Sequence, residues 1–135
     1  MYLDTDCVLA LIKKGDWLED AVCRRLKGER ALMTSVLTVV ECQLVLSREE
    51  GRERITDVGK AIGEKGISLL PIDGHILERS NDLLKRYDLL GIFDSIHAAT
   101  AMTYGEVLLS TDHIFPLIDD LVVEDPRGIA RTIDG

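Results

Sequence analysis

The sequence of 135 residues has little cysteine and no long apolar run. Its three cysteines, Cys7, Cys23 and Cys42, are odd in number and form no C-x-x-C pair. With only three histidines beside them they cannot supply a zinc site, and they favour reduced, packed thiols. The longest apolar stretch, VLTVVECQLVL, is too short to span a bilayer and contains Glu41. Because no signal peptide is recognisable either, we expect a soluble cytoplasmic protein.

The chain also lacks a net positive charge, which at first sight argues against a nucleic-acid partner. It has 16 Lys and Arg against 24 Asp and Glu, a formal net charge of −8. The imbalance is concentrated in residues 94–135, with eight acids and two bases, whereas residues 1–93 have sixteen acids and fourteen bases. The first two-thirds therefore leave room for a basic face. Bound divalent cations would also change the local sign at a cluster of acids.

Short runs rich in Val, Ile and Leu alternate with helical patterns along the whole chain. We expect strands at residues 1–4, 31–35, 67–72, 106–110 and 121–124. The apolar spacing predicts helices over residues 6–13, 16–27, 35–47, 73–87 and 94–105, and a weaker helical stretch over 48–66. Strands separated by helices imply a parallel sheet of four to five strands covered on both faces. The sequence therefore predicts one α/β domain over residues 1–135, a three-layer, Rossmann-like sandwich.

Three acidic residues fall where strands end or helices begin. Asp4 ends the first strand, Asp94 begins the helix after the loop DLLGIF, and Asp112 follows the strand EVLLS. In open α/β sheets, ligands bind beyond the carboxyl ends of the strands, so these acids favour a shared site. Taken singly, Asp94 is explained equally well as a helix N-cap, Asp112 as a turn residue, and Asp4 as a solvated acid.

A fourth acid, Glu41, lies inside a predicted helix. Its helical neighbours Leu37, Leu44 and Val45 share its face, so Glu41 projects from an apolar stripe. A carboxylate buried there without a partner would be destabilising, and the sequence assigns it no basic partner. A cluster of acids around a cation would explain it, and an exposed helix residue is the alternative.

Two histidines lie close in sequence to these acids. His97 is one helical turn past Asp94, and His113 directly follows Asp112. Both could approach the site, but a packed or an exposed histidine is the commoner outcome at such positions. We therefore assign neither of them to the site.

Four ordered blocks of the sequence resemble the PIN-domain nucleases: YLDTDCVLALI, TSVLTVVECQLVL, GIFDSIHAATAMTYG and VLLSTDHIFPLI. They run over nearly the whole chain, and the size and single-domain layout are most similar to toxins of the VapC type. The resemblance implies a PIN-like fold whose acidic site residues are Asp4, Glu41, Asp94 and Asp112. Thr111 matches the hydroxyl residue that usually accompanies the last acid.

The resemblance further implies an endoribonuclease that uses Mg²⁺ or Mn²⁺ to hydrolyse RNA, leaving a 5′-phosphate and a 3′-hydroxyl. We expect Asp4 and Asp94 to bind the metal directly, and Glu41 and Asp112 to act through waters. Thr111 would hold a water or the scissile phosphate. A homodimer is implied as well, and so is a cognate antitoxin protein that blocks the site of a toxin. A housekeeping RNA-processing nuclease is the alternative.

Asp6 belongs to the same stretch as Asp4 but has a different interpretation. We expect it to be the N-cap of the first helix, with a secondary metal role as the alternative. The stretch DTDCVL also satisfies the opening pattern of haloacid-dehalogenase-type phosphatases, although the late acidic pair of that family is missing. A non-catalytic receiver-like signalling domain would need a Lys after its fifth strand, and no Lys follows Lys85.

Overall fold

The structure, a computed structural model, describes residues 1–128 and contains a sheet of five parallel strands in the order β3-β2-β1-β4-β5. These strands are β1 (Tyr2–Leu3), β2 (Leu32–Ser35), β3 (Ile67–Leu70), β4 (Leu108–Leu109) and β5 (Val123–Glu124). Each lies inside a range that the sequence predicts and is shorter than that range. The predicted parallel sheet is therefore confirmed. Residues 129–135, which the single-domain prediction includes, lie outside the described residues.

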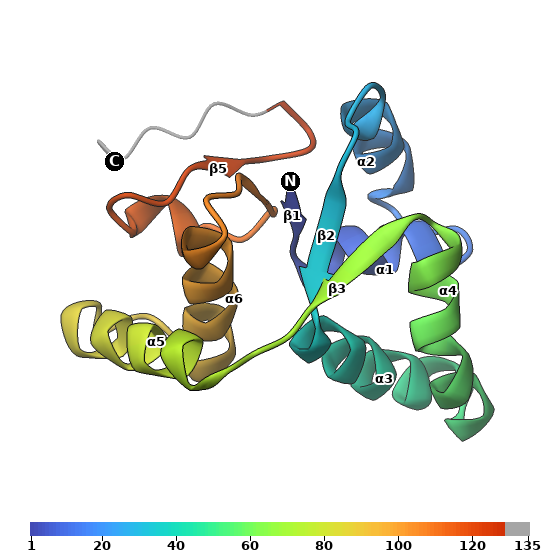
Figure 1. Cartoon of the computed structure of the whole chain (residues 1–135). Coiled ribbons are helices and arrows are strands. Elements are labelled where there is room, and N and C mark those ends of the chain that lie inside the picture. The colour runs from blue at the N-terminus through green and yellow to red at the C-terminus, as the bar shows by residue number, and fades with distance from the viewer. Residues whose placement is uncertain (129–135) are drawn as a thin grey trace.

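Helices cover both faces of this sheet (Figure 1). They are α1 (Thr5–Ile12), α2 (Glu19–Leu26), α3 (Val36–Glu50), α4 (Val58–Glu64), α5 (Gly74–Arg86) and α6 (Ile92–Thr103), with 3₁₀ helices η1 (Arg52–Asp57) and η2 (Phe115–Leu117). In Figure 1, α1 to α4 lie on one side of the sheet, and α5 and α6 lie on the other. None of the helices within residues 1–128 has the length and apolarity needed to cross a membrane. The three-layer sandwich is confirmed.

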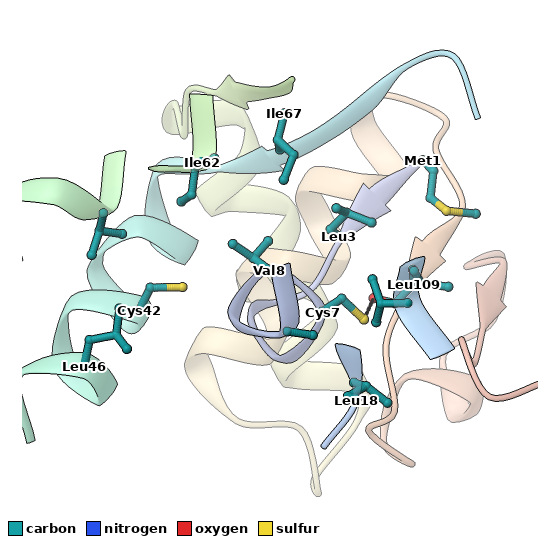
Figure 2. Close-up of a cluster of buried hydrophobic side chains, with 13 residues drawn as sticks. Met1, Leu3, Cys7, Val8, Leu18, Cys42, Leu46, Ile62, Ile67 and Leu109 are labelled. Atoms are coloured by element: carbon teal, nitrogen blue, oxygen red, sulfur yellow. Dashed lines mark hydrogen bonds between the residues drawn. The ribbon is translucent and has the colours of Figure 1, made fainter. Parts of the chain in front are cut away.

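Successive strand residues point to opposite faces and so belong to two hydrophobic cores. Leu3 and Leu109 pack against the helices α1 to α4, as Figure 2 shows. Tyr2 and Leu108 pack on the other face, against α5, α6 and η2. All four side chains are fully buried. The central strands β1 and β4 are therefore the most enclosed part of the sheet, and they carry the residues that lead into the candidate site.

The three thiols are free, and two of them pack as the sequence predicts. Cys7 and Cys42 are buried in the core of Figure 2, where the Cys7 thiol donates to the carbonyl oxygen of Leu109 at 3.4 Å. The prediction is wrong for Cys23, which is exposed. The preceding residue, Val22, takes the buried position of α2 and turns Cys23 toward solvent.

The strand order reverses between β1 and β4. From β1 the chain continues through β2 to β3 on one side, and then returns to place β4 and β5 on the other side. In α/β sheets such a reversal is where ligands bind. Tyr2 pairs with Leu108 and Leu3 with Leu109. The residues that follow the two strands, Asp4 and Ser110, are therefore placed side by side at this reversal.

The first helix begins earlier than predicted, and its cap is a different acid. Asp4 is the N-cap of α1, with extended backbone angles (φ −68°, ψ 164°) and a side chain that accepts from the Thr5 amide. The expectation that Asp6 caps this helix is therefore wrong. Because β1 ends at Leu3, the helix follows the strand with a single residue between them, and that residue is Asp4.

The last long helix also begins earlier than predicted. Gly91 is the N-cap of α6 and its carbonyl oxygen accepts from the Ser95 amide at 3.0 Å, so the helix starts at Ile92 and not at Asp94. Asp94 instead lies in the first turn, where a negative charge interacts favourably with the helix dipole. Its interpretation as a plain N-cap is therefore excluded.

Candidate active site

Asp4 is the most enclosed acid at the reversal of strand order, with 8% of its surface exposed. Its Oδ1 accepts from the Thr5 amide at 2.8 Å, and its Oδ2 accepts from the Ser110 hydroxyl at 2.7 Å. Burial raises the pKa of the Asp4 carboxyl to about 6; the charge of His97 opposes this rise and that of Asp6 adds to it. The fold thus fixes a carboxylate in a place where its charged form is disfavoured.

The face of α3 that carries Glu41 is not the one that the sequence predicts. The buried residues of α3 are Thr38, Cys42 and Leu46, whereas Leu44, placed in the predicted stripe, is 46% exposed. Figure 2 shows Cys42 and Leu46 in the core. Thr38 enters the core because its hydroxyl accepts from the Thr34 hydroxyl at 2.6 Å, which satisfies a buried polar group. Glu41 therefore borders the buried face and does not project from its centre.

Glu41 has a basic partner, the histidine that sequence reasoning left out. The buried His97 of α6 bonds through Nε2 to Glu41 Oε1, and the Thr5 hydroxyl donates to the same oxygen at 3.0 Å. The same Nε2 lies 3.8 Å from Asp4 Oδ1. On the other side of the ring, Nδ1 lies 2.6 Å from the Tyr2 hydroxyl. His97 therefore lies between Asp4 and Glu41, which we call the two inner acids of the site.

The surroundings of His97 favour a positive charge on its ring. Burial opposes that charge, but the hydrogen bond that His97 donates to Glu41 and the negative charges of Asp4, Glu41 and Asp94 together raise the pKa of His97. The Tyr2 hydroxyl donates to Ser35 Oγ at 2.8 Å, so it can accept from Nδ1. With Nε2 donating to Glu41 as well, both ring nitrogens are donors, as they are in an imidazolium.

The two remaining acids form the outer part of the same cluster. Asp94 is half-buried, and its pKa is raised by burial and by the negative charges of Asp112 and Glu41, against a lowering from His97. Asp112 is exposed; its Oδ1 accepts from the Ile114 amide at 3.0 Å, which closes the turn after β4. The charges of Asp112 and Glu41 thus act on Asp94, and Asp4 is connected to this group through His97.

Asp6 and Thr111 connect the first turn of α1 to the turn that follows β4. Asp6 Oδ1 accepts from the Cys7 amide at 2.8 Å, and Oδ2 accepts from the Thr111 amide at 3.0 Å and from its hydroxyl at 2.6 Å. Both carboxylate oxygens of Asp6 are therefore engaged in fastening the start of α1 to the turn that carries Asp112. Thr111 directs its hydroxyl at Asp6, and its expected contact with a water or a phosphate stays a prediction.

Carboxylate oxygens are the ligands that Mg²⁺ and Mn²⁺ prefer. The raised pKa values of Asp4 and Asp94 reflect charges that a bound cation would stabilise. Among the described residues, however, no three His, Cys, Asp or Glu side chains stand close enough together to hold an ion as they are. The donor set fits a hard divalent cation by its chemistry, and side-chain rotation would have to bring the oxygens together.

Comparison with known protein families shows which family this chain belongs to. A family model described as the PIN domain matches residues 1–121. The chain belongs to the PIN domain family. Members of this family are nucleases that act on RNA or DNA. Among curated proteins, no sequence match was found.

Solved PIN structures share the fold at low sequence identity. VapC20 of Mycobacterium tuberculosis, a toxin that cleaves the sarcin-ricin loop, is 18% identical with a TM-score of 0.66, over 78% of this chain and 83% of that chain. The VapBC2 complex of Rickettsia felis bound to promoter DNA is 18% identical with a TM-score of 0.73, over 92% of this chain and 96% of that chain. DNA-bound VapBC of Salmonella typhimurium is 20% identical with a TM-score of 0.72, over 93% of this chain and 96% of that chain. These similarities confirm the expected fold.

The PIN assignment also removes the two rival classes. A receiver domain has the flavodoxin-like strand order 2-1-3-4-5, which differs from the order found here. A haloacid-dehalogenase-type phosphatase would need Asp6 as a general acid and base, but both oxygens of Asp6 accept hydrogen bonds from the chain. The resemblance to PIN nucleases seen in the sequence is thereby confirmed.

Proposed function

We propose that this protein is an endoribonuclease that depends on Mg²⁺ or Mn²⁺ and acts as the toxin of a toxin–antitoxin pair. The observation that supports the proposal is that Asp4 and Glu41 both face His97 Nε2, while the charges of Glu41 and Asp112 act on Asp94. The membership of the PIN family supports nuclease chemistry at these residues. The toxins among the similar structures favour the toxin role over housekeeping RNA processing.

In the proposed mechanism, Asp4 and Asp94 would hold the metal directly, and Glu41 and Asp112 would hold waters around it. A bound Mg²⁺ or Mn²⁺ would lower the pKa of a water and stabilise negative charge on the leaving oxygen. The oxygen of a water would bond to phosphorus as that water gives up one proton to solvent. The bond from phosphorus to the 3′-oxygen would break, and the 3′-oxygen would take up one proton from solvent. The chain itself holds the Asp4 carboxylate in place through Ser110 and the Thr5 amide.

The proposed partners are RNA, an antitoxin protein and a second copy of this chain. The antitoxin would place an Arg or Lys among the site acids, where a positive charge is favoured. For the second copy, α3 offers an exposed apolar stripe of Val36, Val40 and Leu44, with 44%, 49% and 46% exposure. A short DNA-binding protein encoded directly upstream would support the toxin role, and purification as a dimer would support the third partner.

The test is cleavage of labelled RNA in Mg²⁺ or Mn²⁺ by the wild type and by Asp94→Asn. We expect cleavage that EDTA abolishes and that the variant lacks, because the substitution removes a metal-binding oxygen. Asp82→Asn is the matched control, since Asp82 is exposed on α5 and its loss changes the net charge equally. Equal activity of Asp94→Asn and wild type would overturn the site assignment.

A further inference from the structure

We propose that His97 is the positioning residue of the site, which acts through Glu41. Its Nε2–H holds Glu41 Oε1 and leaves Oε2 as the oxygen available to the metal-binding cluster. This inference rests on the proposed function, because it concerns how the site presents an oxygen to a divalent cation. His97 touches neither metal nor substrate in this role; it sets the direction of the Glu41 carboxylate, which in the proposed mechanism holds a water of the metal.

Glu41 needs such a contact because its side chain is long. A free glutamate on a helix surface samples several rotamers, and ordering it lowers the conformational entropy of the chain. Here two donors, His97 Nε2 and the Thr5 hydroxyl, meet on the same carboxylate oxygen. Two donors on one oxygen anchor that oxygen and restrict the rotation of the carboxylate. Partners of this kind behind metal ligands orient the ligand and tune its affinity for the ion.

The His97 ring is itself held in place from behind. Its Nδ1 lies 2.6 Å from the Tyr2 hydroxyl, and the two rings meet edge to face at 5.8 Å and 62°. Tyr2 is fully buried on β1, and its hydroxyl reaches Ser35, the residue that caps α3. The chain of contacts therefore connects β1, which leads into Asp4, with α3, which carries Glu41. It fixes the two inner acids relative to each other.

The contact does not depend on the charge of the ring. An Nε2–H is present in the imidazolium and also in the neutral tautomer whose Nδ1 accepts from a hydroxyl. In both states His97 donates to Glu41. An apolar side chain of similar size would fill the same buried space without a donor, and a glutamine would bring an amide N–H toward the Nε2 position. These two substitutions separate packing from positioning.

The test is calorimetric titration with Mn²⁺ of full-length wild type, His97→Leu, His97→Gln and Thr100→Val. We expect His97→Leu to weaken Mn²⁺ binding by about 10–100-fold, as is typical when an outer partner of a metal ligand is removed. His97→Gln should regain about tenfold of that loss, because it restores a donor. Thr100→Val is the matched control: Thr100 is buried on the same helix, and its hydroxyl donates to the Ile96 carbonyl at 2.7 Å, away from Glu41.

A double-mutant cycle tests whether His97 acts through Glu41. In the background of Glu41→Ala, His97→Leu should weaken Mn²⁺ binding by less than about twofold, because the residue that it positions is gone. Additive losses would overturn the proposal. So would wild-type affinity in His97→Leu, or no recovery in His97→Gln. If wild type binds no Mn²⁺, the proposed function fails together with this inference; if it does bind, the inference is judged alone.

Melting temperatures in EDTA keep the test valid if a variant folds poorly. If His97→Leu fails to fold, Tyr2→Phe replaces it as the test variant. It keeps the packing of the ring at position 2 and removes only the hydroxyl that contacts His97 Nδ1. We expect severalfold weaker Mn²⁺ binding from folded Tyr2→Phe. Wild-type Mn²⁺ affinity in this folded variant would overturn the proposal.

Discussion

The inner half of the acidic cluster is built differently from its outer half. The inner acids, Asp4 and Glu41, are held by the Thr5 amide and hydroxyl, by Ser110 and by His97. Of the outer acids, Asp94 is half-buried, as Glu41 is, in the first turn of a helix, and Asp112 is exposed in a turn. The fold therefore holds the inner carboxylates through contacts between separate elements, whereas the hydrogen bond of Asp112 to the Ile114 amide lies within its own turn.

The largest expected effect comes from the inner acid that is most constrained. Asp4→Asn should lower RNA cleavage by more than about a hundredfold, beyond the range typical of outer partners, because it removes a metal-binding charge. The same variant should be more stable than wild type in EDTA at pH 8, by roughly 2 kcal/mol, because a disfavoured buried charge is gone. Urea unfolding measures this difference, and a less stable variant would contradict the description of the inner half.

The outer acid gives a smaller and purely functional effect. Asp112→Asn should lower cleavage by about 10–100-fold, as expected for a residue that acts on the metal through water. Its stability in EDTA should match wild type, because asparagine can still accept from the Ile114 amide. The measurement is the same RNA assay together with a melting curve. A loss of stability as large as the loss of activity would show that Asp112 has a structural role instead.

The free energy of unfolding should depend on pH in one direction. The pKa values of Asp4, Asp94 and His97 are all raised in the folded protein, so the folded state binds more protons than the unfolded chain. In EDTA, stability should therefore fall as the pH rises from about 4 through 6, where Asp4 ionises, and further above about 6.5 as His97 loses its proton. Asp4→Asn should flatten the lower part of this curve. A stability that increases from pH 5 to pH 8 would contradict the assignment of these three groups.

The smallest expected effect concerns Asp6, which belongs to neither half. Asp6→Asn should lower the free energy of unfolding by about 1–2 kcal/mol, because charged hydrogen bonds to the turn of Thr111 are weakened. Cleavage should fall only moderately, since Asp112 is displaced but present. Thr111→Val provides the comparison, as it removes one of the same hydrogen bonds. If Asp6→Asn abolished Mn²⁺ binding, Asp6 would be a metal ligand and not only a structural link between α1 and the turn of Thr111.

The fold could be predicted from the sequence because its elements are local. The apolar runs that become β2 and β3 are short and are followed by helical patterns, which is typical of a parallel sheet. The strand order could not be derived, because it depends on which side of β1 the chain returns to after α6. The sequence favours Asp94 as the cap of α6, because aspartate is the stronger capping residue by type, whereas the structure places Gly91 at that position.

The candidate site residues can be read from the sequence only where they lie at the ends of local elements. Acids at strand ends are visible in the sequence, and Asp4 and Asp112 were found in this way. The partners of Glu41 were not, because His97 is 56 residues away and Tyr2, behind it, is 95 residues from His97. The buried face of α3 was misjudged because Thr38 counts as polar, although a hydrogen bond makes it a core residue.

The most direct measurement is a crystal structure of the protein grown with Mn²⁺, with the ion located by its anomalous scattering. If the four acids form one metal site, the strongest anomalous peak lies within coordination distance of carboxylate oxygens of Asp4 and Asp94. Glu41 should remain hydrogen-bonded to His97 in that structure. If the strongest anomalous peak lay elsewhere on the chain, and the side chains of Asp4 and Asp94 kept their positions, the claim that the four acids form one metal site would be contradicted.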